Sequence, residues 1–229
     1  MKPPWLVVSP HCDDGVFSCG ALLAAHPGSV VVTVFAGRPA RYEPFTEWDR
    51  ACGFKPGDDV MASRRREDAA ALGCLAAQPL WLSFLDKQYR STPRADEVAA
   101  ALSEAIDRCA PRAIAFPLWL FHSDHVLVRE AMLALAFRRE LPPAAVYVDA
   151  LYRCIPGAVE TALGVLSRRG YALRERKLPS DAAAAAAKRE AVECYASQLR
   201  GLATPGRPGH LDAYSPERRL DLALAVVPA

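Results

Sequence analysis

Two short motifs bring together residue types that bind divalent metal ions. The first reads HCDD at residues 11–14, the second reads HSDH at residues 122–125, and each follows an apolar run. Imidazole nitrogens and carboxylate oxygens are the ligands of zinc-type ions. His11 and Asp14 can both turn toward one point, and His125 can supply a third ligand. Three protein ligands with an open fourth position are the pattern of a catalytic zinc site.

The remaining polar side chains of the motifs suit the proton transfers of a hydrolysis. A bound ion polarises a carbonyl group and lowers the pKa of water. Asp13, adjacent to Asp14 but pointing elsewhere, is placed to take the proton of that water. His122 can face the same cavity without binding the ion. In its protonated form it would stabilise an oxyanion or protonate a leaving group.

Each motif alone also has a simpler interpretation. HCDD can be a turn in which an Asp side chain caps backbone amides, and HSDH can be a helix N-terminus with Ser123 as its N-cap. The two motifs lie about 110 residues apart, each after a predicted strand. Each also supplies ligand types that the other lacks. Their combination favours one shared site.

Alternating strand and helix patterns predict the scaffold of this site. We expect an α/β fold, a Rossmann-like three-layer sandwich whose mostly parallel central sheet is flanked by helices, with residues 1–229 as a single domain. Right-handed crossovers would bring the loops after the first, second and fourth strands to one edge of the sheet. Strands are predicted at residues 5–8, 29–35, 79–84, 113–116, 144–149 and 171–177, with an edge strand at residues 219–227.

Composition narrows the class of protein. Of 229 residues, 52% are hydrophobic and 24% charged, which is typical of a packed globular domain. The formal net charge of +2 gives no field for nucleic acid or an anionic membrane. No apolar run approaches the roughly 18 residues of a membrane span. Seven scattered cysteines without a CxxC pair, and the lack of a signal-peptide pattern, predict a cytoplasmic protein. The oligomeric state stays open.

The two motifs resemble those of the PIG-L/LmbE-like family of zinc-dependent N-acetylglucosaminyl deacetylases, usually written HxDD(E) and HxDH. Three weaker signatures extend the resemblance: R-x-x-E at residues 64–67, Asp86 after the third strand, and K-x-x-A-x-x-x-Y-x-S-Q at residues 188–198. The chain departs from the family pattern at Gly15, where Glu is common, and at Leu75-Ala76, where Leu-Gly is usual.

The resemblance implies a function and a role for each site residue. The activity implied is removal of an N-acetyl group from an amino sugar or related small-molecule amide, with Zn²⁺ as cofactor. Asp13 would be the general base, His122 the electrophilic or acid partner, and Arg64 a contact for substrate hydroxyls or a phosphate. The implied zinc ligands are His11, Asp14 and His125. The expected partner is a small N-acetylated amino sugar or glycoconjugate.

Two other functions remain open from the residues alone. One is a non-catalytic Rossmann-like nucleotide- or sugar-binding module, disfavoured because the first loop lacks the GxGxxG that lets amides approach a pyrophosphate. The other is a zinc hydrolase acting on a different amide or ester bond.

Residues 37–59 are predicted to form a long irregular loop. This loop is a candidate substrate wall, with Arg38, Trp48 and Phe54. The alternative is a surface loop with its own apolar cluster.

Overall fold

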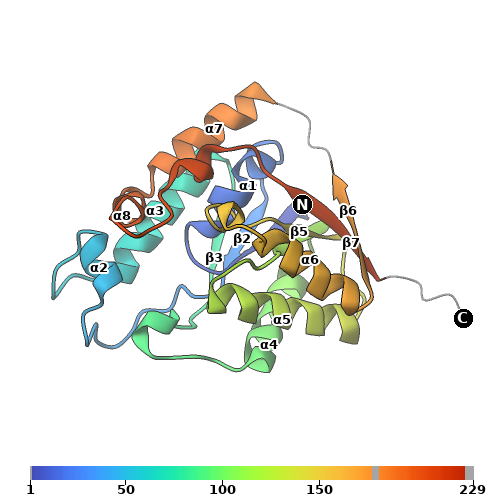
Figure 1. Ribbon diagram of the computed structural model, residues 1–229, viewed down its shortest axis with the longest axis horizontal. Coiled ribbons are helices and arrows are strands. Elements are labelled where there is room, and N and C mark those ends of the chain that lie inside the picture. The colour runs from blue at the N-terminus through green and yellow to red at the C-terminus, as the bar shows by residue number, and fades with distance from the viewer. Residues whose placement is uncertain (1, 177–180, 225–229) are drawn as a thin grey trace, which may run out of the picture.

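Seven strands form the central sheet of the computed structural model, which describes residues 2–176 and 181–224 (Figure 1). Their order across the sheet is β3-β2-β1-β4-β5-β7-β6. The strands from β3 to β5 are parallel, and β7 runs antiparallel to both neighbours. The expected mostly parallel α/β sheet is confirmed. In chain order the strands are β1 (Trp5–Ser9), β2 (Val30–Thr33), β3 (Gln78–Trp81), β4 (Ala113–Pro117), β5 (Ala144–Tyr147), β6 (Tyr171–Arg176) and β7 (Arg219–Leu224).

The expected edge strand at residues 219–227 lies elsewhere in the sheet. Its described part is β7, which lies between β5 and β6 and so is internal. Residues 225–227 of this expected strand, and residue 177 of the one expected before it, lie outside the described residues. Leu220 pairs with Val146 and is buried against the core. Strand order depends on such long-range packing, which a local sequence pattern does not encode.

Alternate residues of β1 enter the two hydrophobic cores on opposite faces of the sheet. Leu6 and Val8 belong to the core covered by α4 (Ala95–Cys109), α5 (Ser123–Arg138) and α6 (Ala158–Arg168). Val7 belongs to the other core, under α1 (Asp14–Ala24), α3 (Val60–Cys74) and α7 (Ala182–Glu193). Figure 1 shows these helices as the outer layers of the sandwich. None of the helices in the described part of the chain is long and apolar enough to cross a bilayer.

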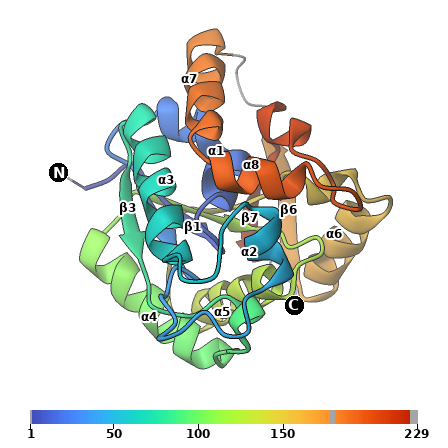
Figure 2. The ribbon, with the colours of Figure 1, turned by 90° about the vertical axis from the view of Figure 1, so that its left-hand side faces the viewer.

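Residues 37–59 are partly helical, so the expectation of an irregular loop is wrong in part. Thr46 caps the short helix α2 (Glu47–Ala51) by accepting a hydrogen bond from the N–H of Asp49. The helix packs on α8 (Ala196–Leu202), as Figure 2 shows. A Cβ atom at Gly201 would lie 2.7 Å from the Sγ of Cys52, so glycine is needed at this approach. The helices α2 and α8, which are far apart in the sequence, thus pack together beside the sheet.

The sheet has its topological switch point between β1 and β4. From β1 the chain continues outward to β2 and β3, whereas β4 and β5 lie on the other side of β1. Ligands of open α/β sheets bind in the crevice at such a point, beyond the carboxyl ends of the strands. The HCDD loop follows β1 and the HSDH segment follows β4, so the two motifs meet there.

Candidate metal centre

Asp14 lies between two imidazoles at the switch point. Its Oδ2 is 3.1 Å from His11 Nδ1 and 3.1 Å from His125 Nε2. The backbone N–H of His11 also donates to this oxygen, at 2.9 Å. A tetrahedral zinc site with bonds of about 2.0–2.1 Å has ligand atoms roughly 3.3 Å apart. One carboxylate oxygen of Asp14 therefore lies at about this spacing from a nitrogen of each expected histidine ligand.

The outer nitrogen of each imidazole faces a further carboxylate. His11 Nε2 lies 3.2 Å from Asp124 Oδ2, and His125 Nδ1 lies 2.6 Å from Asp149 Oδ1. When Nδ1 of His125 donates to Asp149, its buried Nε2 carries a lone pair, and this atom makes no hydrogen bond to the described residues. That lone pair and the Asp14 carboxylate are both acceptors, and only a cation or a proton satisfies both. This carboxylate–histidine–metal arrangement is typical of zinc sites.

Further residues with possible metal-ligand atoms lie close to His11. His122 has a nitrogen within 4.8 Å of nitrogens of His11 and His125, and a second group combines His11 with Asp86 and Asp124. A tetrahedral ion with an open position needs only three protein ligands. The cluster therefore holds more possible ligands than one ion requires, and two of the extra ones, His122 and Asp86, line a cavity.

Neighbouring opposite charges shift the pKa values of Asp14 and His125 in opposite directions. Burial raises the pKa of Asp14, but the imidazoles of His125 and His11 outweigh it and hold the pKa well below its usual value. Burial lowers the pKa of His125, but Asp14 and Asp149 raise it to about 9. In the metal-free protein this imidazole therefore attracts a proton, which a bound cation must displace.

Asp13 and Arg64 lie side by side in the cavity. Burial and the neighbouring Asp14 raise the pKa of Asp13, while Arg64 and His11 oppose them. Arg64 is only 3% exposed, and its Nη2 and Nη1 lie 3.6 Å from Asp13 Oδ1 and Asp86 Oδ2, beyond hydrogen-bond distance. Within the described residues its Nε and Nη1 have no hydrogen-bond partner. The buried guanidinium therefore has donors that no described residue uses, and it lines the cavity.

His122, rather than the expected Ser123, is the N-cap of α5. Its Nδ1 accepts a hydrogen bond from the N–H of Asp124, at 3.3 Å. Burial, and then the charges of His11 and His125, lower the pKa of His122 to about 4. The side chain is therefore neutral near pH 7, and the cap leaves its proton on Nε2. This form suits a neutral hydrogen-bond donor better than a charged acid.

Asp149 is a site residue that sequence reasoning missed. It follows β5, the strand beside β4, and its Oδ2 accepts the backbone N–H of Trp119 at 2.8 Å while Oδ1 faces His125. The available signal was an acidic residue directly after a buried strand. Only the pairing of β5 with β4 reveals that this residue lies behind His125, an expected metal ligand.

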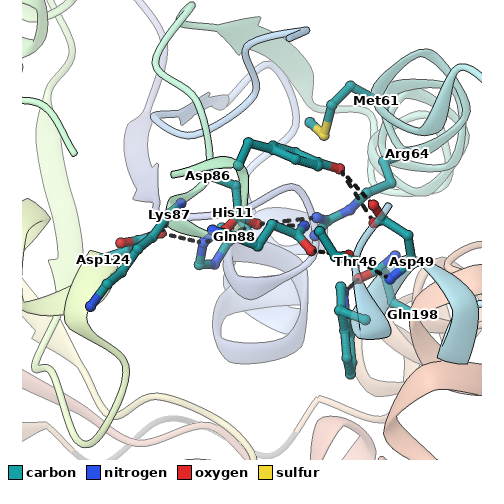
Figure 3. A network of polar contacts seen from close by, with 12 residues as sticks. His11, Thr46, Asp49, Met61, Arg64, Asp86, Lys87, Gln88, Asp124 and Gln198 are labelled. Atoms are coloured by element: carbon teal, nitrogen blue, oxygen red, sulfur yellow. Dashed lines mark hydrogen bonds and ion pairs between the residues drawn. The ribbon is translucent and has the colours of Figure 1, made fainter. Parts of the chain in front are cut away.

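A polar network joins the metal centre to α2 and α8. Figure 3 shows His11 and Asp86 at its centre, with Asp124 on one side and Arg64 toward Asp49 on the other. The backbone N–H of Lys87 donates to Asp124 at 3.2 Å, so η1 (Lys87–Tyr89) is tied to the same cluster. Of these residues, His11, Arg64 and Asp86 line a cavity of about 470 Å³, within the range of small-molecule sites.

The expected substrate wall at residues 37–59 contributes one of its three named residues to the cavity. Trp48 lines it, and its Nε1 donates to Gln198 Oε1 at 3.3 Å. Arg38 instead forms an exposed ion pair with Asp59. Phe54 is not among the described residues that line the cavity.

Fold and donor set together define an α/β protein with a candidate metal site at the switch point of the sheet. Within that class, the chain belongs to the PIG-L family: the family model described as GlcNAc-PI de-N-acetylase matches residues 6–136, more than half of the chain. The expected family membership is confirmed.

Individual relatives are deacetylases by name. The 2'-N-acetylparomamine deacetylase of Streptomyces fradiae is 32% identical over 149 residues, which are 56% of this chain and 50% of that protein. The chain thus matches about half the length of this curated relative. The crystal structure of the antimicrobial reagent A40926 pseudoaglycone deacetylase has a TM-score of 0.80 and 26% identity, with all of both chains covered. The zinc-inhibited form of teicoplanin deacetylase has a TM-score of 0.82 and 26% identity, with 98% of this chain and 99% of that chain covered.

Proposed function

We propose that this protein is a zinc-dependent N-deacetylase, which hydrolyses the acetamide of an N-acetylated amino sugar, free or within a glycoconjugate. The observation that carries the proposal is the convergence of Asp14 Oδ2 on His11 Nδ1 and His125 Nε2, in the same cavity as Asp13. The family match and the deacetylase relatives, one of them in a zinc-inhibited form, support it. The proposed ligands of the ion are therefore His11, Asp14 and His125.

Asp13 is the proposed general base of the reaction. When bound, Zn²⁺ supplies Lewis acidity, which polarises the acetamide carbonyl and acidifies water. Asp13 takes the proton of the attacking water and passes it to the departing amine nitrogen, so that acetate and a free amine are released. Its raised pKa brings it closer to the working pH, which favours both transfers.

His122 and Arg64 are the proposed substrate contacts. The Nε2–H of neutral His122 donates a hydrogen bond to the carbonyl oxygen as negative charge develops there. The guanidinium of Arg64 binds sugar hydroxyls, and Asp86 and Gln198 line the same cavity. A site built to hydrogen-bond hydroxyls rejects acetamides that lack them, because its buried donors would be left unpaired.

The proposal is tested with the Asp13→Asn variant. Metal analysis should find about one zinc ion per chain in both proteins, because Asp13 is not a ligand. Turnover of methyl 2-acetamido-2-deoxyglucoside, measured as free amine, should fall about 10²–10⁴-fold in the variant, because the general base is lost. Retained turnover would remove Asp13 from its role. A wild-type protein that binds no divalent ion would instead favour the non-catalytic binding module.

A further inference from the structure

An exposed phenylalanine stands directly beside the catalytic machinery. Phe121 precedes His122, lines the active-site cavity and is 69% exposed. Its ring stacks on Tyr152, with centroids 5.8 Å apart and an angle of 27° between the ring planes. Tyr152 in turn meets His125 edge-on at 5.5 Å. A row of aromatic rings therefore runs from a proposed metal ligand out to solvent.

The cavity has a polar wall and an apolar wall. The polar wall comprises the lining residues Arg64, Asp86 and Gln198, and the apolar wall comprises Phe121, Tyr152 and Ile155. Asp86 follows β3, whereas Phe121 follows β4 and Tyr152 follows β5, so these segments come from strands on opposite sides of β1. Ile155 also borders a neighbouring hollow of about 240 Å³, whose other lining residues are Trp119, Leu120, Pro156, Gly157, Ala158 and Thr161. Mostly apolar residues therefore continue from the cavity into this neighbouring hollow.

Carboxylates fix the backbone of the apolar wall. Trp119 and Leu151 have positive φ angles, +74° and +72°, which non-glycine residues rarely adopt. Asp149 accepts the N–H of Trp119, and Asp212 accepts the N–H of Leu151, each at 2.8 Å. Arg153 holds Asp212 in place, with its Nε 2.8 Å from Oδ2. The wall is therefore preformed, which lowers the entropic cost of binding a ligand to it.

We propose that Phe121, Tyr152 and Ile155 form a subsite for an aromatic aglycone attached to the acetamido sugar. This inference rests on the proposed function, which places the sugar against the polar wall. A second sugar in the subsite would press hydroxyls against Ile155 and Pro156, where they lose hydrogen bonds to water without replacement. An aromatic group would instead cover the exposed face of Phe121 in an offset stack. The substrate class is thus an N-acetyl amino sugar glycosidically linked to an aromatic scaffold.

Matched glycosides test the subsite. Methyl and 4-nitrophenyl 2-acetamido-2-deoxy-β-glucoside carry the same acetamido sugar and differ only in the aglycone. The aryl glycoside should have a kcat/KM about five- to tenfold higher with the zinc-loaded protein, mainly through KM, since one aromatic contact accounts for about that factor. Phe121→Ala should abolish this ratio, and Phe121→Tyr, which keeps the ring, should preserve it.

The control is a second exposed phenylalanine, in the helix that begins just after Phe121. Phe137, in α5, is 83% exposed and lies outside the described lining of the cavity. Phe137→Ala should leave the aryl-to-methyl ratio unchanged. Equal kcat/KM values for both glycosides, or a ratio unaffected by Phe121→Ala, would overturn the subsite while leaving the deacetylase function intact.

A binding measurement separates failure of the subsite from failure of the function. The dissociation constant of the 4-nitrophenyl glycoside for the Asp13→Asn protein should rise about five- to tenfold on adding Phe121→Ala. If the wild-type protein deacetylates neither glycoside but this difference is found, the proposed function fails and the subsite stands. If the difference is absent, the subsite is wrong.

Discussion

At the scale of single residues, Asp149 decides which nitrogen of His125 faces the metal centre. Its short contact to Nδ1 holds the proton there and leaves the lone pair of Nε2 toward Asp14. Removal of such an outer carboxylate typically costs 10–100-fold in metal affinity. We therefore expect Asp149→Ala to weaken zinc binding by about that factor, measured by competition with a chromogenic chelator. Unchanged affinity would show that His125 keeps its orientation without this partner.

Asp68 should make stability depend on pH in an unusual direction. Burial raises the pKa of this carboxyl to about 7, helped by Asp13 and opposed by the hydrogen bonds from Trp81 and Tyr195. The folded state then keeps a proton that the unfolded chain releases near pH 4. This contribution, on the order of 4 kcal/mol, is present below pH 4 and is lost as the pH rises through 7.

The Asp68→Asn variant isolates this effect because its amide cannot titrate. Urea titrations of the metal-free proteins give both unfolding free energies. Between pH 4.5 and 7 the unfolding free energy of the wild type should fall relative to that of the variant. A difference that is constant over this interval would mean that Asp68 is ionised in the folded protein throughout.

At the scale of elements, the start of α1 is held close to the sheet. The N–H of Gly15 donates to the Oγ of Ser9 at 2.8 Å. A Cβ atom at Gly15 would lie 3.1 Å from side-chain atoms of Ser9 and Val31, closer than ordinary van der Waals contact. This close approach gives a local reason for glycine at the position where the family commonly has Glu. The loop that carries the proposed ligands His11 and Asp14 is therefore followed by a close approach that favours a small residue.

Two glycine-to-alanine changes test this close approach. Gly15→Ala should destabilise the protein by about 1–3 kcal/mol, because Ser9 and Val31 must move. Gly73, in α3, has no atom within 4 Å of a built Cβ among the described residues, so Gly73→Ala should stabilise by about 0.5–1 kcal/mol through helix propensity. Urea unfolding of both variants measures the contrast. A Gly15→Ala variant as stable as Gly73→Ala would show that α1 can shift freely.

At the scale of the whole molecule, the sequence was informative where chemistry is local. The HCDD and HSDH motifs predicted the residues that meet at the switch point, because each motif follows its own strand by a few residues. The carboxylate of Asp149 behind His125 and the internal position of β7 were not predictable, since both depend on which strands pair across the sheet. The same holds for Phe121, whose exposure beside Tyr152 appears only in the folded chain.

Metal binding should stabilise the whole fold by an amount that grows with pH. In the metal-free protein, burial lowers the pKa of His125, but Asp14 and Asp149 outweigh burial. They raise the pKa to about 9, above its value in the unfolded chain. Its stabilising charge contacts are present below about pH 6.5 and are lost as the pH rises through 9. Zinc must displace the same proton, so its affinity rises over this interval.

As the pH rises, the metal-free protein loses the charge contacts of the His125 imidazolium, whereas zinc binds more tightly to the folded protein. An ion that binds only the folded state stabilises it by RT ln(1 + [L]/Kd). The gap in unfolding free energy between zinc-loaded and chelator-treated protein should therefore widen from pH 6.5 to 8.5 at a fixed, buffered concentration of free zinc. Urea unfolding at three pH values measures it, and Asp68 contributes equally to both forms. A gap that stays constant or narrows would show that no proton leaves the imidazoles when the ion binds.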